Sequence, residues 1–320
     1  MNLWERIAVY GAVLVAFVVS LFLDLKITQS LYDPENLFGQ IFELIAELPA
    51  FTLVVFALSC LAFHHPKFEK KWLNILLTAV FFALALAASL YGGNHFRHLL
   101  NRVTHLDFPS WLTLVYSLVY LACGVPWVFM IKNPNVKEIC VFGASILCMF
   151  VVTLGVMQGL KMLWLRPRYR TLVALYGENA ASYWLPVYQP QGFWSFSKYG
   201  TPGNSVLKAL GIQEWGKEEF YSFPSGHTLH AVVPMAITLL FPLFPKLEGK
   251  QGYVRIGFYV WGALTAVSRI LRGAHNLSDV AFGFFLGVLA FDLVSTFLLP
   301  ALRKLYEKIF ERKPIPQKEA

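Results

Sequence analysis

Long apolar blocks alternate with shorter polar connections along the chain. Blocks of about 18 or more apolar residues with few charges are typical of membrane-spanning helices, because a helix of that length crosses the hydrocarbon core. Eight such spans are predicted. Seven lie at residues 7–23, 73–91, 111–131, 139–160, 228–244, 254–271 and 280–299, and the second span in the chain ends at about residue 63. The predicted fold class is therefore all-α, a polytopic membrane helical bundle of about eight transmembrane helices.

Three connections depart from a simple loop. Glu43 and Glu47 lie four residues apart just before the second span, which fits either a helix at the membrane interface or the first turns of that span. The polar connection after the third span carries His95 and predicts a short surface helix. The segment 165–222 is long for a connection without a function and rich in aromatic residues, so we expect a folded cap on the interface. Its tryptophans are Trp184, Trp194 and Trp215.

Composition supports a membrane protein and excludes an ordinary soluble domain. Of the 320 residues, 57% are hydrophobic and 14% charged, whereas a soluble domain has about 25% charged residues. The formal net charge of +8 invites a nucleic-acid interpretation, but its distribution fits membrane orientation better. We therefore expect membrane lipids as partners and no nucleic acid. The N-terminal apolar block lacks a small-residue cleavage site and predicts a first span.

Basic residues concentrate on one face of the predicted bundle. With eight spans, both termini share a face with the connections at 64–72, 132–138 and 245–253 and with the basic tail 301–320, and most lysines and arginines lie there. Because cationic short loops stay in the cytoplasm, we expect both termini to be cytoplasmic. The segments at 161–168, 225–227 and 269–279 then meet on the extracytoplasmic (periplasmic) face of an inner or plasma membrane.

These three segments hold groups suited to a phosphate ester. Lys161, Arg168 and Arg269 can neutralise phosphate oxygens, and the planar arginine fork matches two oxygens at once. Ser225 and Gly226 precede the sixth span, where free backbone N–H groups would point at an anion. These five residues are the candidate phosphate-binding residues.

Two histidines and one carboxylate are the candidate catalytic residues. We expect His275 to be the nucleophile and to form a phosphohistidine. Asp279 lies one helical turn further on, where it could hydrogen-bond to the far ring nitrogen of His275 and fix its tautomer. His227 would protonate the leaving group and later activate water. No metal and no cofactor are expected, since Cys60, Cys123, Cys140 and Cys148 all lie in or at the edges of apolar blocks.

The motifs resemble those of the type-2 phosphatidic acid phosphatase family. Pro-Ser-Gly-His is complete at 224–227, and Ser-Arg, His and Asp follow at 268–269, 275 and 279 with the family spacing. In the first motif the Lys161–Arg168 spacing is kept, but Tyr169 replaces the proline and Arg166-Pro167 carries the dipeptide two residues early. Spacing favours Arg168 for the phosphate. Arg166, Arg170 and Arg272 are then expected at the interface, and His230 in packing or a supporting hydrogen bond.

The resemblance implies a metal-independent lipid phosphatase with a six-helix core. We expect N-terminal helices at 1–72, a catalytic core at 73–300 that includes the cap 165–222, and a cytoplasmic tail at 301–320. The implied substrate is a polyprenyl diphosphate, phosphatidylglycerol phosphate, phosphatidic acid or a lipid A-type glycolipid. A phosphotransferase using the same intermediate stays open, as does a non-catalytic lipid-binding or transport protein. The sequence indicates no oligomeric state.

Overall fold

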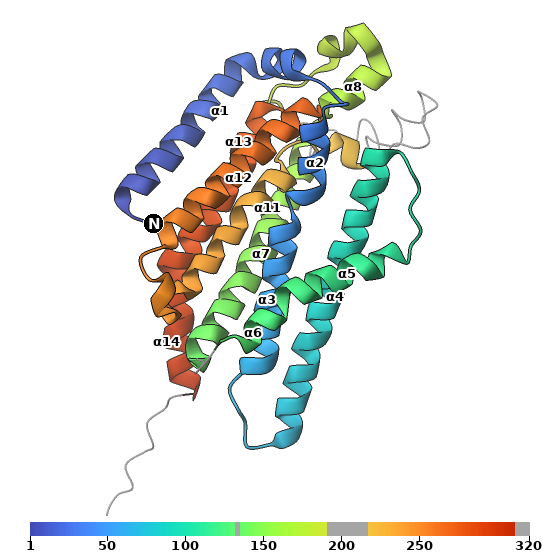
Figure 1. Ribbon diagram of the computed structural model, residues 1–320. Coiled ribbons are helices and arrows are strands. Elements are labelled where there is room, and N and C mark those ends of the chain that lie inside the picture. The colour runs from blue at the N-terminus through green and yellow to red at the C-terminus, as the bar shows by residue number, and fades with distance from the viewer. Residues whose placement is uncertain (132–134, 191–216, 311–320) are drawn as a thin grey trace, which may run out of the picture.

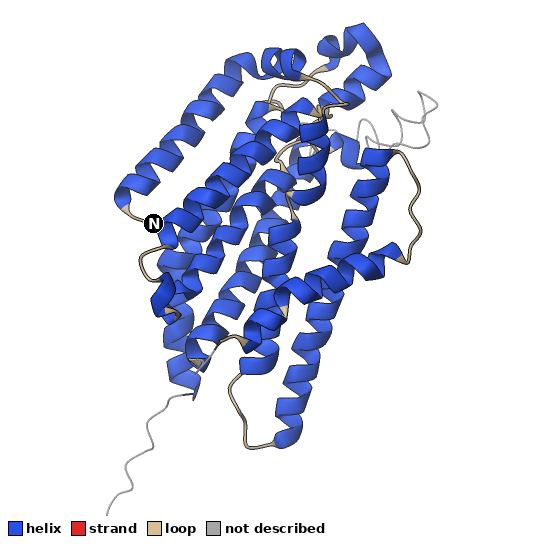
Figure 2. Cartoon of the chain, viewed as in Figure 1, coloured by secondary structure: helices blue, strands red, loops and turns tan. Residues whose placement is uncertain are grey.

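The computed structural model describes residues 1–131, 135–190 and 217–310, and Figure 2 shows helices joined by loops throughout this part. Eight helical segments within it are long and apolar enough to cross a membrane. The predicted all-α membrane bundle is therefore confirmed. The helices are α1 (Leu3–Leu31), α2 (Leu37–Ile45), α3 (Leu48–His64), α4 (Lys71–Thr104), α5 (Leu112–Gly124), α6 (Pro126–Phe129), α7 (Val136–Trp164), α8 (Tyr169–Tyr176), η1 (Gly177–Tyr183), η2 (Lys217–Phe220), α11 (Gly226–Val232), η3 (Val233–Leu243), η4 (Pro245–Leu247), α12 (Gln251–Leu271), α13 (Leu277–Leu293), η5 (Val294–Leu298) and α14 (Leu299–Phe310).

One apolar core joins the centre of the bundle. Buried side chains of α3, α7, α11, η3 and α13 pack together in it, among them Phe56, Phe142, Val232 and Phe291. Helix α3 thus shares its core with helices from the C-terminal half of the chain. Burial of this apolar surface holds those helices side by side at the middle of the molecule (Figure 1).

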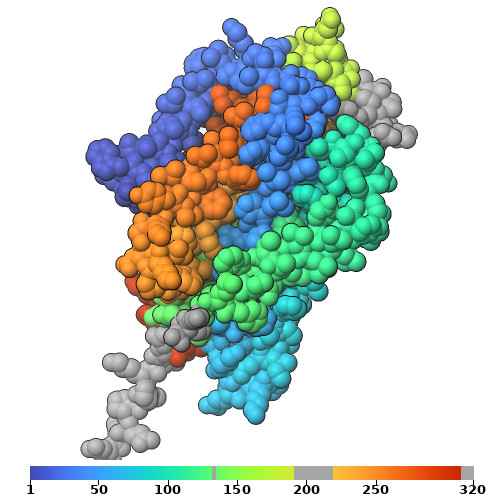
Figure 3. All heavy atoms as spheres, in the orientation of Figure 1, coloured from blue at the N-terminus to red at the C-terminus, as the bar shows by residue number. Residues whose placement is uncertain are grey.

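Helix α1 lies at the edge of the molecule, where it runs along α13 (Figures 1 and 3). Asn2 caps it by accepting a hydrogen bond from the backbone N–H of Glu5 at 2.8 Å. Its outer face is apolar, and Phe22 is 81% exposed, which suits contact with lipid. The helix continues past the predicted end at residue 23 to Leu31, so that Asp24 lies within it.

Two other predicted connections also differ from the structure. The expected surface helix after the third span does not exist as a separate element, because α4 continues without a break to Thr104. The segment around Glu43 and Glu47 forms its own helix, α2, and the chain turns at Glu47 before α3 begins at Leu48. Pro49 in the first turn of α3 has no N–H to donate to the preceding turn, which explains a break at this point.

The described part of the predicted cap consists of α8, η1 and η2. Trp184 follows η1 and packs over the guanidinium of Arg166, 5.0 Å from it, which agrees with a place in the cap core. Trp194 and Trp215, the other tryptophans of the predicted cap, lie outside the described residues, as does the end of the basic tail. Cap, α2 and the junction of α12 with α13 all lie at the same end of the bundle (Figure 1).

Candidate active site

The three predicted motif segments meet at this end of the bundle because each lies at a helix terminus. Lys161 is in the last turn of α7, and Arg168 is the N-cap residue of α8. The helix α11 begins directly after Ser225, so His227 lies in its first turn. Arg269 lies in the last turn of α12, and the short connection to α13 contains His275. Antiparallel helices that end at one level therefore bring together residues more than a hundred positions apart.

His275 is held by the loop that precedes α11. Its Nδ1 lies 2.6 Å from the backbone carbonyl oxygen of Ser222, and a carbonyl only accepts, so Nδ1 carries the proton. The Nε2 lone pair is then left to act as a nucleophile. Burial is the main reason why the pKa of His275 lies well below its usual range, and repulsion from Arg168, Arg269 and Lys161 lowers it further. The imidazole is therefore neutral, and so nucleophilic, at neutral pH.

Asp279 supports His275 less directly than the sequence suggested. Its Oδ2 is 3.9 Å from Nδ1 of His275, which is too long for the expected hydrogen bond. Instead, Oδ2 accepts hydrogen bonds from the hydroxyl of Ser222 at 2.5 Å and from the backbone N–H of Asn276 at 2.7 Å. Ser222 thus connects the two residues, since its hydroxyl donates to Asp279 and its carbonyl accepts from His275.

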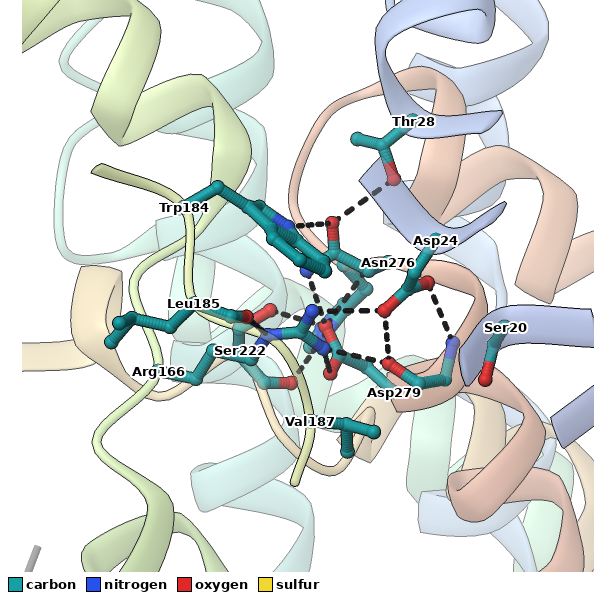
Figure 4. Close-up of polar contacts among 12 residues, drawn as sticks. Ser20, Asp24, Thr28, Arg166, Trp184, Leu185, Val187, Ser222, Asn276 and Asp279 are labelled. Atoms are coloured by element: carbon teal, nitrogen blue, oxygen red, sulfur yellow. Dashed lines mark hydrogen bonds and ion pairs between the residues drawn. The ribbon is translucent and has the colours of Figure 1, made fainter. Parts of the chain in front are cut away.

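Arg166 was expected at the membrane interface, but it occupies the centre of this network (Figure 4). It is 1% exposed, and its guanidinium donates to Oδ1 of Asp279 at 2.6 Å and to Oδ2 of Asp24 at 2.8 Å. It also donates to the hydroxyl of Ser278 and the carbonyl of Leu185. All three of its nitrogens therefore have acceptors within the protein, so Arg166 is structural and holds α1 and the cap against α13.

Arg168 and Arg269 differ from Arg166 because their donors are incompletely used. Both are buried, and Nε and Nη1 of each have no hydrogen-bond acceptor in the part of the chain that the structure describes. Nε2 of His227 is buried and unpartnered in the same way. Buried donors without acceptors are costly and rare in proteins. Three such side chains beside His275 therefore suit a multiply charged oxyanion, such as a phosphoryl group.

The remaining predicted phosphate-binding residues border this position. A Cβ at residue 226 would lie 3.0 Å from the sulfur of Met157 and 3.7 Å from Nζ of Lys161, so the α7 lysine lies beside the start of α11. Ser225 is buried, and its hydroxyl lies 3.0 Å from that of Thr228 and accepts from the Thr228 N–H. The Ser225 side chain thus caps α11, and its role as a phosphate ligand stays a prediction.

Arg170 was expected at the interface, but it forms a partly buried ion pair with Glu219. It donates to both carboxylate oxygens of Glu219, at 2.7 and 3.1 Å, and Thr171 donates to Glu219 at 2.8 Å. Burial alone would raise the pKa of Glu219, yet Arg168 and Arg170 hold the pKa of this carboxyl at about 2. The Glu219 carboxylate is therefore charged at neutral pH.

Two acidic residues of the site were not predicted, Glu43 and Glu47. Both are buried, which excludes the first of the two alternatives left open by the sequence, a helix at the membrane interface that exposes them. Glu43 accepts from Arg269 at 3.3 Å and from Arg272 at 3.2 Å, which also places Arg272 away from the interface. The available signal was an acidic pair within an apolar stretch, because such residues in a membrane span are generally functional.

Glu47 accepts from histidines rather than arginines. Its carboxylate is 2.6 Å from a ring nitrogen of each of His95 and His230, and His227 is nearby. The predicted supporting hydrogen bond of His230 is thus present. Although such a cluster suggests a metal, no group of three or more His, Cys, Asp and Glu in the described ranges has a geometry that could hold one.

Comparison with known proteins defines the class of this molecule. The profile of the PAP2 superfamily matches residues 142–301, half of the chain, and this range contains all three motif segments. The chain therefore belongs to the PAP2 superfamily and is a membrane phosphatase, as the motif resemblance implied.

Two relatives are phosphatidylglycerophosphatase B enzymes. The protein of Bacillus subtilis (strain 168) is 39% identical over 82 residues, which cover 25% of this chain and 40% of that protein. The protein of Haemophilus influenzae (strain ATCC 51907 / DSM 11121 / KW20 / Rd) is 24% identical over 228 residues, which cover 65% of this chain and 89% of that protein. The first match thus spans less than half the length of the relative. No solved structure matches the chain.

Proposed function

We propose that this phosphatase removes a terminal phosphate from a lipid through a phosphohistidine at His275. The observation that carries the proposal is the set of buried, unpartnered donors on Arg168, Arg269 and His227 next to the neutral imidazole of His275. The first two, with Lys161, would bind the three equatorial oxygens of the phosphoryl group.

The reaction follows from this arrangement in two steps. Nε2 of His275 forms a bond to phosphorus while the bond from phosphorus to the leaving oxygen breaks, and His227 gives that oxygen its proton. The neutral His227 then takes a proton from water, whose oxygen attacks phosphorus and releases phosphate from His275. Ser222 and Asp279 would keep the Nδ1–H tautomer of His275 through both steps.

A lipid substrate fits the surroundings of the site. A cavity of about 800 Å³ lies between α3, α5, α6, η3 and α12, and its walls are almost wholly apolar. It begins at Leu48 and Pro49, directly after Glu47, and continues along η3 from Pro234 to Phe244. Since these elements are membrane spans, a hydrocarbon chain in this cavity would place its phosphate next to His227.

Among lipid phosphates, we propose phosphatidylglycerol phosphate as the first substrate to test, because both relatives carry the name phosphatidylglycerophosphatase B. Phosphatidic acid, polyprenyl diphosphate and lipid A-type phosphates are the alternatives. The distribution of basic residues supports a site on the extracytoplasmic face with both termini in the cytoplasm.

The test is phosphate release from a panel of purified lipid phosphates by the detergent-solubilised protein. The parent is expected to be active in excess EDTA, and His275→Ala to lose at least about 10³-fold in kcat/KM. Activity of His275→Ala within about tenfold of the parent would reject the nucleophile. A ³²P-labelled donor separates hydrolysis from transfer, since label that ends on a second lipid instead of in free phosphate would make the protein a phosphotransferase.

A further inference from the structure

The carboxylate of Glu47, at the turn between α2 and α3, contacts imidazoles from two different helices. Its Oε2 is 2.6 Å from Nε2 of His95 on α4, and its Oε1 is 2.6 Å from Nδ1 of His230 on α11. The Glu47 side chain is 7% exposed. Because each carboxylate oxygen is held by a separate helix, the orientation of the carboxylate is fixed.

A third imidazole, that of His227, faces the same carboxylate without a hydrogen bond to it. Nε2 of His227 is 3.8 Å from Oε2 of Glu47, and this nitrogen has no acceptor within the described chain. Such a distance permits an ion pair but is too long for proton sharing. Since both oxygens of Glu47 already accept from His95 and His230, a proton on His227 stays available for another acceptor.

The charges around His227 give Glu47 a specific task. The His227 side chain is 13% exposed, and its ring centre lies 6.4 Å from that of His95 on α4. The Glu47 carboxylate, 3.8 Å from Nε2 of His227, is a negative charge close enough to favour a positive imidazolium. In a buried setting the attraction between a carboxylate and an imidazolium is weakly screened by water and salt. Glu47 therefore offsets part of the cost of charging His227.

We propose that Glu47 is a positioning residue for protonation of the leaving group. This inference rests on the proposed function, in which His227 gives its proton to the leaving oxygen as His275 bonds to phosphorus. Glu47 stabilises the imidazolium before the transfer, and His95 and His230 hold the carboxylate in place. Glu47 lies outside the range matched by the PAP2 profile, which begins at residue 142.

The test compares two substrates with the same alkyl chain, an alkyl phosphate and a 4-alkyl-2-nitrophenyl phosphate. An alkoxide leaves poorly and needs the proton, whereas a nitrophenolate leaves easily without it. The parameter is kcat/KM, because it reports the steps up to formation of the phosphohistidine and not its hydrolysis. Both substrates are measured on one preparation, so the ratio of their kcat/KM values does not depend on how much protein is folded.

We expect Glu47→Gln to lower kcat/KM about 10²-fold for the alkyl phosphate and less than about threefold for the nitrophenyl phosphate, since general acid catalysis contributes about 10²–10⁴-fold. An equal fall with both substrates would show that Glu47 only supports the fold and would overturn the proposal. If Glu47→Gln does not fold, Glu47→Asp keeps the charge but withdraws the carboxylate, and a loss of about tenfold confined to the alkyl phosphate is expected; an equal loss again overturns the proposal.

Two further variants make the result specific. Glu43→Gln removes a second buried carboxylate, four residues earlier, that hydrogen-bonds to arginines, so we expect a much weaker leaving-group dependence than for Glu47→Gln. His227→Ala should show the leaving-group dependence at least as strongly as Glu47→Gln. If His227→Ala shows none, the acid role in the proposed function fails; if His227→Ala shows it and Glu47→Gln does not, only the inference about Glu47 fails.

Discussion

Asp24 connects α1 to the candidate active site. Replacing it by Asn tests how much this connection contributes to stability and activity. The Oδ2 atom of Asp24 accepts from Arg166 at 2.8 Å and from the hydroxyl of Ser278 at 2.5 Å, while Oδ1 accepts from the backbone N–H of Ser278 at 3.0 Å. Figure 4 shows these contacts beside Asp279. The change Asp24→Asn keeps the shape of the side chain and removes its charge.

The expected cost follows from the burial of this ion pair. Removing one partner of a buried pair costs about 3–5 kcal/mol, because the other charge loses its compensation. Arg166 keeps Asp279 as a counter-ion, and the amide oxygen of Asn can still accept from Ser278, so the lower limit of about 3 kcal/mol applies. This corresponds to a fall of about 6–12 °C in the melting temperature. Activity should fall as well, because Arg166 also holds Asp279.

The melting temperature can be followed in detergent with a thiol-reactive dye, since Cys60 and Cys140 are buried free thiols that become reactive on unfolding. Asp292→Asn is the matched control. Asp292 lies on α13 and also pairs with α1, through Arg6 at 2.7 Å, but the two side chains are 15% and 37% exposed. Because this pair is partly exposed and screened by water, we expect it to contribute about 1 kcal/mol at most, so this variant should melt within about 3 °C of the parent. If Asp24→Asn melts no lower than Asp292→Asn, the buried connection does not stabilise the protein.

Three other predictions address the site, the cavity and the cap. Vanadate, which imitates five-coordinate phosphorus, should compete with substrate, and insensitivity to millimolar vanadate would contradict the proposed oxyanion site at Arg168 and Arg269. Replacing Thr52 and Ile237 together by Trp should raise KM about tenfold for a long-chain lipid phosphate but not for a short-chain one, because both line the apolar cavity; Leu118→Trp, at an exposed position outside it, is the control, and an equal rise with both chain lengths would refute the assignment. Because the pKa of Glu219 is about 2, its stabilising effect is complete above about pH 5 and is lost as pH falls toward 2. The drop in melting temperature caused by Glu219→Gln should therefore shrink between pH 5 and about 3, and a drop that does not change with pH would contradict the ion pair.

The features predicted correctly from the sequence are those with local signals. The eight spans follow from the apolar blocks, because each block by itself must be long and apolar enough to cross the bilayer as a helix that satisfies its own backbone hydrogen bonds. The superfamily follows from short motifs at fixed spacing. The choice of Arg168 over Arg166 for the phosphate stays a prediction, which the open donors of Arg168 and the saturated guanidinium of Arg166 support. The roles of the individual site residues stay predictions, as does the boundary between N-terminal helices and catalytic core at residue 72.

The features that sequence did not predict are long-range charge pairs. Asp24 pairs with a residue 142 positions away, and Glu43 with one 226 positions away. Neither spacing nor periodicity indicates such partners. Each acid lies near an end of an apolar stretch, where a water-facing position at the interface is an equally good explanation. Only the packing of α1 and α2 against the C-terminal helices determines whether these two carboxylates face water or a buried arginine.

These pairs decide which cations can act on a phosphate. Buried arginines cannot be gathered at one end of a bundle without counter-charges, because each uncompensated charge costs several kcal/mol. Asp24 and Asp279 occupy Arg166, and Glu219 occupies Arg170. Glu43 neutralises Arg269 only in part, because Nη1 lies 3.1 Å from the carboxylate without the alignment of a hydrogen bond. The carboxylates thus sort chemically equal arginines into structural ones and ones with free donors. This sorting depends on residues before position 142, so it belongs to the whole chain and not to the motif segments alone.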